Sequence, residues 1–328
     1  MKKKVGIFMG GYSPEWEISM QSGLTVFNNL NTEEFDRYKV IINRNSWTVS
    51  EGVHSWPLKK DTLTFIKEGT EVHFDVIFNA IHGHPGEDGY MQALFEMNNI
   101  PHSSCGFFES ALTFNKSKTN ELLKSQGIVV PKARFYTDTK SIDPKEVASF
   151  FGLPLFIKPN RSGSSFGVTR VNDEKSILPA IQAALKEDNQ VIIEEAILGT
   201  ELGCGVACIN GKTEAIATTE IVSKKEFFDY EAKYLGASEE ITPARIDAEV
   251  EKLIFKQSEK IYNYLGLWGV IRADYIVRDN IPYLIEVNSI PGLSPASIIP
   301  QQLAHRNWAL PAFFGGLLHE SIERNQNK

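Results

Sequence analysis

Four polar side chains alternate with apolar ones in two short runs near the end of the chain. Arg272 and Asp274 lie in the first run, Glu286 and Asn288 in the second, and Asp279-Asn280 marks a turn between them. Because side chains alternate faces along a strand, a hairpin here places Asp274 opposite Glu286, to within one residue of register. Crowded carboxylates need a cation or a hydrogen-bonding shell, and oxygen ligands suit magnesium rather than zinc. The spacing therefore predicts a magnesium site, with an ordinary Arg–Asp pair on a solvated strand face as the alternative.

A run of small residues beside a lysine is suited to phosphate binding. Residues 161–167 read Arg-Ser-Gly-Ser-Ser-Phe-Gly and follow Lys158-Pro159 at the end of a predicted strand. Small residues let backbone N–H groups approach a phosphate, and Lys158 adds a point charge. Such loops are common, so a plain flexible hairpin is the alternative. A Walker-like run from Gly205 to Thr213 is set aside, because its glycines have five residues between them rather than four.

Two loops in the first hundred residues also follow predicted strands. One reads His-Gly-His-Pro-Gly-Glu-Asp-Gly and covers residues 82–89. Ligands bind at the carboxyl ends of strands in α/β proteins, so His82 could donate a hydrogen bond to one, although a structurally satisfied loop histidine is commoner. Glu15 follows Gly10-Gly11 at a similar junction. A helix N-terminus stabilises a carboxylate there, which explains Glu15 without any function.

The elements that must position these residues follow from periodicity and turn signals. In the first part of the chain, strands are expected at 5–9, 38–43 and 75–81. Ser13-Pro14 is expected to cap a helix after the first of these strands, and a second helix is expected at 90–98. In the second part, the expected helices are 107–126, 144–151 and 174–186, and the expected strands are 132–136, 155–158, 168–171 and 191–195.

The third part begins with a hairpin around Asn210-Gly211, a strong turn signal, between strands 202–209 and 213–222. A long polar loop at 223–242 is typical of an enzyme lid. A helix at 247–265 precedes the hairpin that carries Asp274. We therefore predict an α/β fold of three lobes: an open parallel α/β lobe at 1–105 and two α+β lobes at 106–195 and 196–328.

Composition excludes several functional classes. The chain has 328 residues, a net charge of -7 and 42% hydrophobic residues, which is typical of a globular protein without an electrostatic site for nucleic acid or an anionic membrane. Three cysteines form no disulfide framework and suit a reducing cytosol. The apolar N-terminal run is too short for a signal peptide, and the stretch from Trp308 to Leu318 is too short to span a membrane. We expect a cytoplasmic protein with neither nucleic acid nor membrane as a partner.

These motifs occur in an order that resembles the D-alanine–D-alanine ligase family, part of the ATP-grasp superfamily. The resemblance covers nearly the whole chain and rests on residues 10–15, 82–89, 158–159 with 163–165, 230–234 (Tyr-Glu-Ala-Lys-Tyr) and 286–292. It implies ATP-grasp architecture, with ATP between the central and C-terminal lobes. It also implies that ATP phosphorylates the carboxylate of one D-alanine and that the amine of a second attacks the acylphosphate. The product, D-alanyl-D-alanine, would serve peptidoglycan precursor synthesis.

The resemblance further assigns roles by motif match. Two Mg²⁺ ions, with Mn²⁺ as a substitute, would be held by Asp274, Glu286 and Asn288. ATP would meet Lys116, Lys158, Ser164, Ser165, Glu194, Ala196, Ile197, Glu201 and Asn288. The substrates would meet Glu15, His82, Lys233, Arg272, Gly292 and Ser297. The catalytic group would be Glu15, Ser164, Tyr234 and Arg272, with hydrogen bonds linking the first three of them. A homodimer and a monovalent cation are further expectations from the family.

Three alternatives differ in which residues they explain. An ATP-grasp ligase for another carboxylate–amine pair would share the metal site but not Glu15, His82 and Tyr234. A regulatory nucleotide-binding relative would lack metal carboxylates or Arg272, and this chain has all of them. Ligases that make D-alanyl-D-lactate depart from the Lys233-Tyr234 pair, so the lid favours an amine as the second substrate. The preference for D- over L-alanine rests on the resemblance alone.

Overall fold

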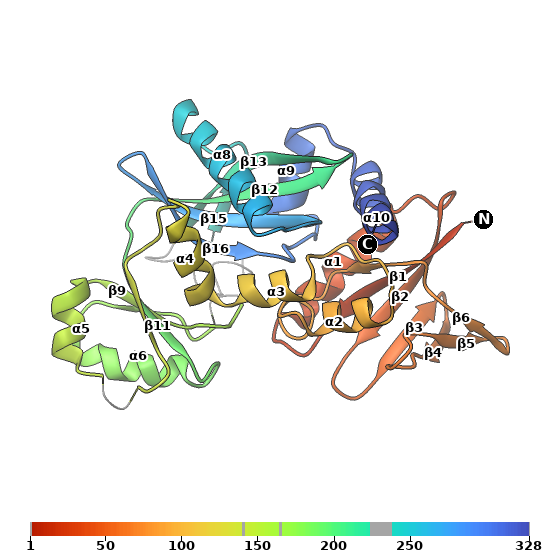
Figure 1. Ribbon diagram of the computed structural model, residues 1–328, viewed down its shortest axis with the longest axis horizontal. Coiled ribbons are helices and arrows are strands. Elements are labelled where there is room, and N and C mark those ends of the chain that lie inside the picture. Colours follow the sequence, from red (N-terminus) through yellow and green to blue (C-terminus); the bar gives the residue numbers. More distant parts are fainter. Residues whose placement is uncertain (1, 140–141, 164–165, 224–237, 328) are drawn as a thin grey trace.

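The computed structural model describes residues 2–139, 142–163, 166–223 and 238–327. Ser164, Ser165, Lys233 and Tyr234, which the resemblance singles out, lie outside the described residues. The described strands form three large sheets and one small hairpin (Figure 1). The described elements include both helices and strands, which confirms the predicted α/β fold class.

The first sheet is mostly parallel at its centre. Its order is β4 (His54–Pro57), β3 (Trp47–Glu51), β2 (Phe35–Ile42), β1 (Lys3–Gly10) and β7 (Val76–Asn79). β1 runs parallel to both β2 and β7, and its residues from Val5 to Gly10 are all buried. A continuous apolar run is expected for a parallel strand covered on both faces, here with α1 (Trp16–Asn29) packed against it. Four strands between residues 47 and 72, including β5 (Phe65–Lys67) and β6 (Thr70–Val72), were not anticipated from the sequence.

Two predicted helix boundaries were wrong. The expected helix at 107–126 is two helices, α3 (Phe107–Phe114) and α4 (Lys116–Ser125), because Asn115 between them is extended and its side chain accepts a hydrogen bond from the N–H of Lys118. An asparagine that competes with the backbone in this way interrupts a helix. Ser13 does not cap α1: the helix begins later, and the Ser13 hydroxyl accepts from the N–H of Glu15.

The second sheet is antiparallel, with the order β10 (Thr169–Val171), β9 (Leu155–Pro159), β11 (Val191–Glu195) and β8 (Ala133–Tyr136). The helices α5 (Pro144–Phe151) and α6 (Ile177–Ala184) share one hydrophobic core with these strands. A short 3-10 turn, η1 (Glu174–Ser176), precedes α6. Lys158 and Glu194 are therefore on adjacent strands, β9 and β11.

The third sheet has the order β14 (Ser238–Ile241), β13 (Lys212–Ser223), β12 (Thr200–Ile209), β15 (Val270–Arg278) and β16 (Ile281–Asn288). Packed near it are α8 (Ala248–Tyr264), α9 (Ile298–His305) and α10 (Leu310–Gln326). The prediction of an uninterrupted loop at 223–242 was wrong in its last residues, because β14 pairs with β13 along the edge of the sheet. Its polar sequence, Ser-Glu-Glu-Ile, is usual for an edge strand and gives no apolar signal.

One hydrophobic core joins the first and third sheets. α10 contacts β7, β12 and α1, and in Figure 1 it lies between the two sheets. The rings of Phe78 on β7 and Phe314 on α10 meet edge to face, with centroids 5.6 Å apart. This packing holds the loops after β1 and β7 close to the end of β16. The lobe boundaries near residues 105 and 195 stay a prediction.

Two further sequence expectations concern cysteines and membrane spans. All three cysteines, Cys105, Cys204 and Cys208, are free. In the part of the chain that the structure describes, no helix combines the length and the apolar character that a membrane span needs.

Candidate active site

The hairpin of β15 and β16 has the predicted register. Asp274 is the cross-strand partner of Glu286, and Arg272 is the partner of Asn288. Arg272 donates two hydrogen bonds to Asp274, from Nε to Oδ1 at 2.6 Å and from Nη2 to Oδ2 at 2.7 Å. The Asn288 amide adds a third, from Nδ2 to Oδ2 at 2.9 Å. The Arg–Asp pair of the alternative hypothesis is therefore present, but it is largely buried rather than solvated: Asp274 is 8% exposed.

A cation neutralises the second carboxylate of the hairpin as well. Lys116, at the start of α4, places Nζ 3.3 Å from Glu286 Oε2 and donates to the carbonyl oxygen of Ser162 at 2.7 Å. Among the described residues, no group of three His, Cys, Asp or Glu side chains is gathered closely enough to hold a metal ion. The predicted donors are two carboxylates and one amide on neighbouring strands, and their oxygens suit Mg²⁺ by chemistry. The set fits a magnesium site in which a ligand supplies further oxygens.

A cavity of about 240 Å³ lies between the second and third sheets. Five of the predicted ATP-binding residues line it: Lys116, Lys158, Glu194, Ile197 and Glu201. Apolar side chains complete the wall, among them Phe156 and Ile276. Ala196 is not one of the lining residues, and its N–H instead bonds to the Pro154 carbonyl. A slot with cations at one end and apolar walls is suited to a nucleotide.

Lys158 and Glu194 form a buried ion pair inside this cavity. Nζ lies 2.6 Å from Oε2, and the two side chains are 9% and 3% exposed. The other carboxylate oxygen, Oε1 of Glu194, is buried and has no hydrogen-bond partner among the described residues. A buried acceptor without a partner is costly. It can therefore receive an N–H group from a ligand.

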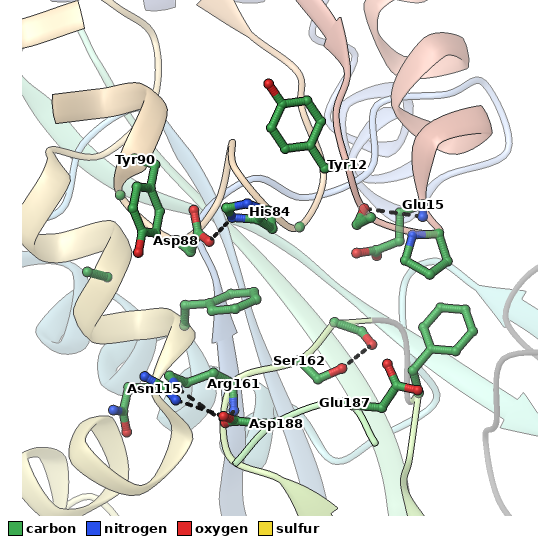
Figure 2. Close-up of a pocket in the computed structure, with 18 of the residues that line it drawn as sticks. Tyr12, Glu15, His84, Asp88, Tyr90, Asn115, Arg161, Ser162, Glu187 and Asp188 are labelled. Atoms are coloured by element: carbon green, nitrogen blue, oxygen red, sulfur yellow. Dashed lines mark hydrogen bonds and ion pairs between the residues drawn. The ribbon is translucent and has the colours of Figure 1, made fainter. Parts of the chain in front are cut away.

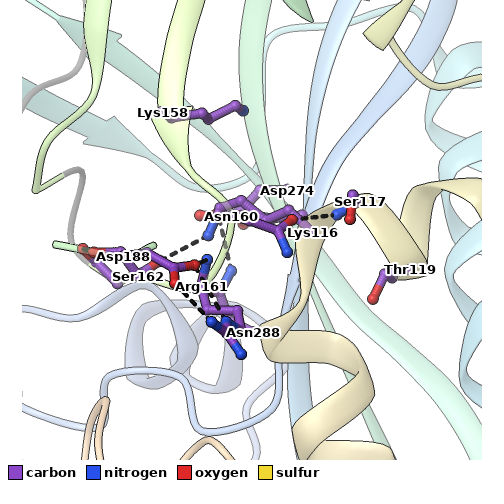
Figure 3. A network of polar contacts seen from close by, with 12 residues as sticks. Lys116, Ser117, Thr119, Lys158, Asn160, Arg161, Ser162, Asp188, Asp274 and Asn288 are labelled. Carbon is purple, nitrogen blue, oxygen red and sulfur yellow. Dashed lines mark hydrogen bonds and ion pairs between the residues drawn. The ribbon is translucent and has the colours of Figure 1, made fainter. Parts of the chain in front are cut away.

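Asn160 is a residue of this region that sequence analysis missed. It is fully buried and its side-chain amide donates to Asn115 Oδ1 at 2.8 Å and to Gln190 Oε1 at 3.0 Å. Its Oδ1 accepts from the N–H of Ser117, and its carbonyl accepts from the N–H of Lys116. Figure 3 shows this network at the first turn of α4. Asn160 thus fixes Lys116 and Lys158, the two lysines predicted to meet the phosphates, relative to each other, and the only sequence signal was its place after Lys-Pro.

A second cavity, of about 210 Å³, contains the predicted substrate residues. Every one of them that the structure describes lines it: Glu15, His82, Arg272, Gly292 and Ser297. These residues come from distant parts of the chain. The first space is called the nucleotide cavity below and this second one the substrate cavity. Lys116 and Glu286 line the nucleotide cavity, and Glu286 and Asn288 line the substrate cavity. Glu286 therefore stands at the boundary between the two cavities.

Two glycines allow the chain to approach Glu15 closely. A Cβ at Gly163 would lie 2.6 Å from Glu15 Oε2, and a Cβ at Gly83 would lie 2.7 Å from the same atom. Gly83 also has a φ of +64°, which L side chains rarely adopt. Glu15 is 8% exposed, and its carboxylate lies between Gly83, in the loop after β7, and Gly163. Its predicted contacts with Ser164 and Tyr234 lie outside the described residues.

His82 is held by both ring nitrogens. Nδ1 lies 2.9 Å from the carbonyl oxygen of Ile290, and Nε2 lies 2.9 Å from the hydroxyl of Ser22. Because a carbonyl only accepts, Nδ1 carries the proton and Nε2 accepts from Ser22. Ser22 in turn accepts from the N–H of Leu293 at 3.0 Å. Burial lowers the pKa of His82, so the ring is neutral and joins α1 to the loop that carries Gly292.

Glu87 also holds this loop, although sequence analysis gave it no role. Its carboxylate accepts from the N–H of Gly83 at 3.1 Å and from the N–H of Ile290 at 3.4 Å. Burial, and next the charge of Glu15, raise the pKa of Glu87 to about 8. Ser22 and Glu87 could not be singled out because the contacts that join them to the loop at 290–293 are to backbone N–H groups more than 200 residues away.

A wider cleft of about 780 Å³ opens beside Glu15 (Figure 2). On one side are Tyr12, His84 and Tyr90, and on the other are Arg161 and Asp188. Two polar pairs fix its walls: Arg161 Nη2 lies 2.7 Å from Asp188 Oδ1, and His84 Nδ1 lies 2.6 Å from Asp88 Oδ2. Because Glu15 and Gly163 line both spaces, the cleft leads to the substrate cavity.

Comparison with known proteins agrees with this geometry. Family models described as the N-terminus and the C-terminus of D-ala D-ala ligase match residues 4–105 and 122–319. A D-alanine–D-alanine ligase of Flavobacterium psychrophilum is 44% identical over 98% of both chains. Among solved structures, the VanG D-Ala:D-Ser ligase of Enterococcus faecalis has 33% identity and a TM-score of 0.88, and covers 97% of this chain and 99% of its own.

A D-alanine–D-alanine ligase of Bacillus anthracis, solved in complex with ATP, is 25% identical with a TM-score of 0.79 and covers 99% of each chain. The family models together span most of the chain, and the curated relative matches it from end to end. The protein therefore belongs to the D-alanine–D-alanine ligase family.

Proposed function

We propose that this protein joins two D-alanine molecules in an ATP-dependent reaction that yields D-alanyl-D-alanine, ADP and phosphate. The observation that carries the proposal is the position of Glu286 at the wall shared by the nucleotide cavity and the substrate cavity. A phosphoryl group can pass from one cavity to a carboxylate in the other only if the two meet. Phosphoryl transfer needs positioning and cationic neutralisation more than covalent help from the protein.

The first step is transfer of the γ-phosphoryl group to the carboxylate of the first D-alanine. Glu15 would bind the ammonium of that substrate, while Arg272 would face its carboxyl group from the cavity wall. His82 lines the same wall, but its one N–H is already donated to the Ile290 carbonyl, so it would position the loop rather than donate to the substrate. Lys116 and Lys158 would neutralise the phosphates from the neighbouring cavity. One P–O bond forms to the substrate and one breaks to ADP, which leaves an acylphosphate beside Arg272.

The second step is attack on the acyl carbon by the second D-alanine, after its ammonium has lost a proton to solvent: the C–N bond forms, the C–O bond to phosphate breaks, and phosphate leaves with that electron pair. Ser297 is the N-cap residue of α9, and its own side chain makes no capping hydrogen bond to that helix. Unpaired N–H groups at a helix N-terminus attract an anion, so the carboxylate of the second substrate would bind there. Gly292 permits this approach, because a Cβ would lie 2.7 Å from Ser297 Oγ. Arg272 would stabilise the oxyanion that forms during attack.

ATP would occupy the nucleotide cavity. The buried Oε1 of Glu194 can accept from the amino group of adenine, Ile197 gives an apolar contact, and Glu201 can accept from the ribose hydroxyls. Mg²⁺ ions at Asp274, Glu286 and Asn288 would neutralise phosphate charge when bound. Two Mg²⁺ ions, replacement by Mn²⁺, activation by a monovalent cation, a homodimer, a cytoplasmic location and a role in peptidoglycan precursor synthesis belong to the same proposal.

The test is phosphate release from ATP and Mg²⁺ with D-alanine, L-alanine or no amino acid, and with D-lactate or D-serine added beside D-alanine. We expect release that requires D-alanine, with the dipeptide as product. A mixed product with D-serine would point to the activity named for the Enterococcus relative, and a mixed product with D-lactate would point to a depsipeptide ligase. If no phosphate is released with any of these substrates, the proposal is refuted.

A further inference from the structure

Glu240 lies in the wall of the substrate cavity, and no motif assigned it a role. It is on β14, the edge strand of the third sheet, and its cross-strand partner is Ile221 on β13. Cross-strand partners share one face of a sheet. Both residues line the cavity that also contains Arg272 and Ser297. The neighbour Glu239 pairs with Val222 on the opposite face and is exposed.

The carboxylate of Glu240 is held next to the loop that carries Ser297. Gln301, in the first turn of α9, donates from Nε2 to Glu240 Oε2 at 2.6 Å and to the carbonyl oxygen of Ala296 at 3.0 Å. Gln301 supplies the one side-chain hydrogen bond that Glu240 makes within the described residues. The other carboxylate oxygen can therefore accept from a ligand in the cavity.

The charge balance of this wall favours a cation beside Glu240. Burial raises the pKa of Glu240, and the hydrogen bond from Gln301 and the positive charge of Arg272 oppose that rise. Arg272 is already paired with Asp274, so its guanidinium is not free to neutralise Glu240 fully. A partly buried carboxylate is stabilised by a directly bound cation far more than by a distant one.

We propose that Glu240 binds the α-ammonium of the second amino acid and thereby selects an amine over a hydroxy acid at that position. The inference rests on the proposed function. In an α-amino acid the ammonium and the carboxylate are both bonded to the α-carbon, so a substrate whose carboxylate lies at Ser297 and the N-terminus of α9 presents its ammonium to nearby groups of the same wall. Glu240 is an anionic group of that wall outside the predicted metal ligands.

The preference for an amine follows from how well each substrate neutralises the Glu240 carboxylate. An ammonium satisfies the buried carboxylate with charge-assisted hydrogen bonds. A hydroxyl at the same place offers one neutral donor and leaves the negative charge without a counterion, which is costly in a partly buried site. Recognition of the amine would thus depend on Glu240 of β14 and not on the Lys233-Tyr234 pair.

A purely structural role is the competing explanation. Glu240 could simply fasten β14 to α9 through Gln301. The variant Glu240→Gln separates the two roles, because its amide oxygen still accepts from Gln301 while its charge is gone. Glu239→Gln removes the same charge one residue away on the opposite, exposed face and is the matched control.

The experiment measures dipeptide formation against D-alanine concentration with Mg²⁺ and saturating ATP, for the wild type and both variants. We expect Glu240→Gln to lower kcat/KM for the second D-alanine by about tenfold or more, to raise the share of D-alanyl-D-lactate when D-lactate competes, and to leave the KM for ATP unchanged. Glu239→Gln should match the wild type. Equal melting temperatures for the three proteins show that the fold is unaffected.

A second readout isolates the first step. Hydroxylamine traps an acylphosphate as a hydroxamate, and at low D-alanine the Glu240→Gln variant should form it at the wild-type rate. Wild-type kinetics for dipeptide formation in Glu240→Gln, or an equal loss in Glu239→Gln, would overturn the inference and leave the proposed function standing. If the wild type itself forms no dipeptide, the proposed function has failed first.

Discussion

The nucleotide cavity and the substrate cavity share Glu286 but are built in different ways. In the nucleotide cavity, the ion pair between Lys158 and Glu194 joins residues diagonally opposed on the adjacent strands β9 and β11, and Lys116 comes from the first turn of α4. Glu201 and Glu286 enter it from the third sheet. The substrate cavity is assembled from the loops after β1, β7 and β16, from α1 and α9, and from strands β13 to β16 of the third sheet. The ion pair of the nucleotide cavity therefore depends on strand pairing within one sheet, whereas the substrate cavity depends on packing between distant segments.

The largest effect is expected where the two cavities meet. Glu286→Ala removes the shared carboxylate, takes away the anion that faces Lys116 and would deprive bound phosphates of a metal ligand. We expect turnover to fall by about a thousandfold or more, since one preorganised electrostatic group is commonly worth that much. Dipeptide formation under saturating substrates measures it.

The matched control is Glu214→Ala, which also removes a carboxylate paired with cations, here Lys212 and Arg306, but outside both cavities. It should keep near-normal turnover. Near-normal turnover of Glu286→Ala as well would remove the basis for placing phosphoryl transfer at the shared wall.

A smaller and one-sided effect is expected inside the nucleotide cavity. Glu194→Gln keeps the shape of the side chain but removes the charge that faces Lys158 and weakens the buried acceptor Oε1. The KM for ATP should rise by about tenfold, while the KM values for D-alanine stay unchanged. Steady-state kinetics with each substrate varied in turn separate the KM for ATP from the KM values for D-alanine.

The control Glu220→Gln changes a carboxylate paired with Arg245, outside the nucleotide cavity, and should leave ATP binding intact. A change in D-alanine binding alone would contradict the assignment of the two cavities.

The difference between the cavities also decides what could be predicted from the sequence. The register of Asp274 with Glu286 followed from the alternation of residues and from the Asp-Asn turn, both of which are local. Neither Ser22 nor Asn160 carries such a signal: each is an ordinary polar residue whose partners become neighbours only when distant segments pack. The same holds for β14, whose polar residues form a strand because β13 offers an edge. Spacing alone predicted the metal site at Asp274 and Glu286 and a phosphate role for Lys158, whereas most other single-residue roles came from the family resemblance. The residues at 164–165 and 233–234 lie outside the described part.

A moderate effect on the substrate side comes from Ser22→Ala. The change leaves the buried N–H of Leu293 without its acceptor and His82 without its donor. Such an unsatisfied buried group costs about 1–3 kcal/mol, so the free energy of unfolding should fall by that amount and the KM for D-alanine should rise while the KM for ATP holds. Denaturant unfolding and kinetics measure the two effects.

Ser321→Ala is the control for this change. Ser321 is also a buried helical serine, but its hydroxyl bonds to the Leu317 carbonyl of its own helix. Its loss should cost less stability and leave D-alanine binding unchanged. An equal effect of the two variants on the KM for D-alanine would show that Ser22 does not act through the loop at 290–293.

The smallest effect tests how local the nucleotide cavity is. Asn115→Ala removes the N-cap of α4, whose side chain accepts from the N–H of Lys118 and from Asn160, and should lower the free energy of unfolding by about 1 kcal/mol. Asp247→Ala removes the N-cap of α8 and should cost about the same. Only the first cap precedes a lysine that lines the nucleotide cavity, so only Asn115→Ala should also raise the KM for ATP, by a few-fold. If both variants lose stability and neither changes ATP binding, Lys116 is positioned by Glu286 and Ser162 rather than by the start of its own helix, and the nucleotide cavity depends on tertiary contacts as much as the substrate cavity does.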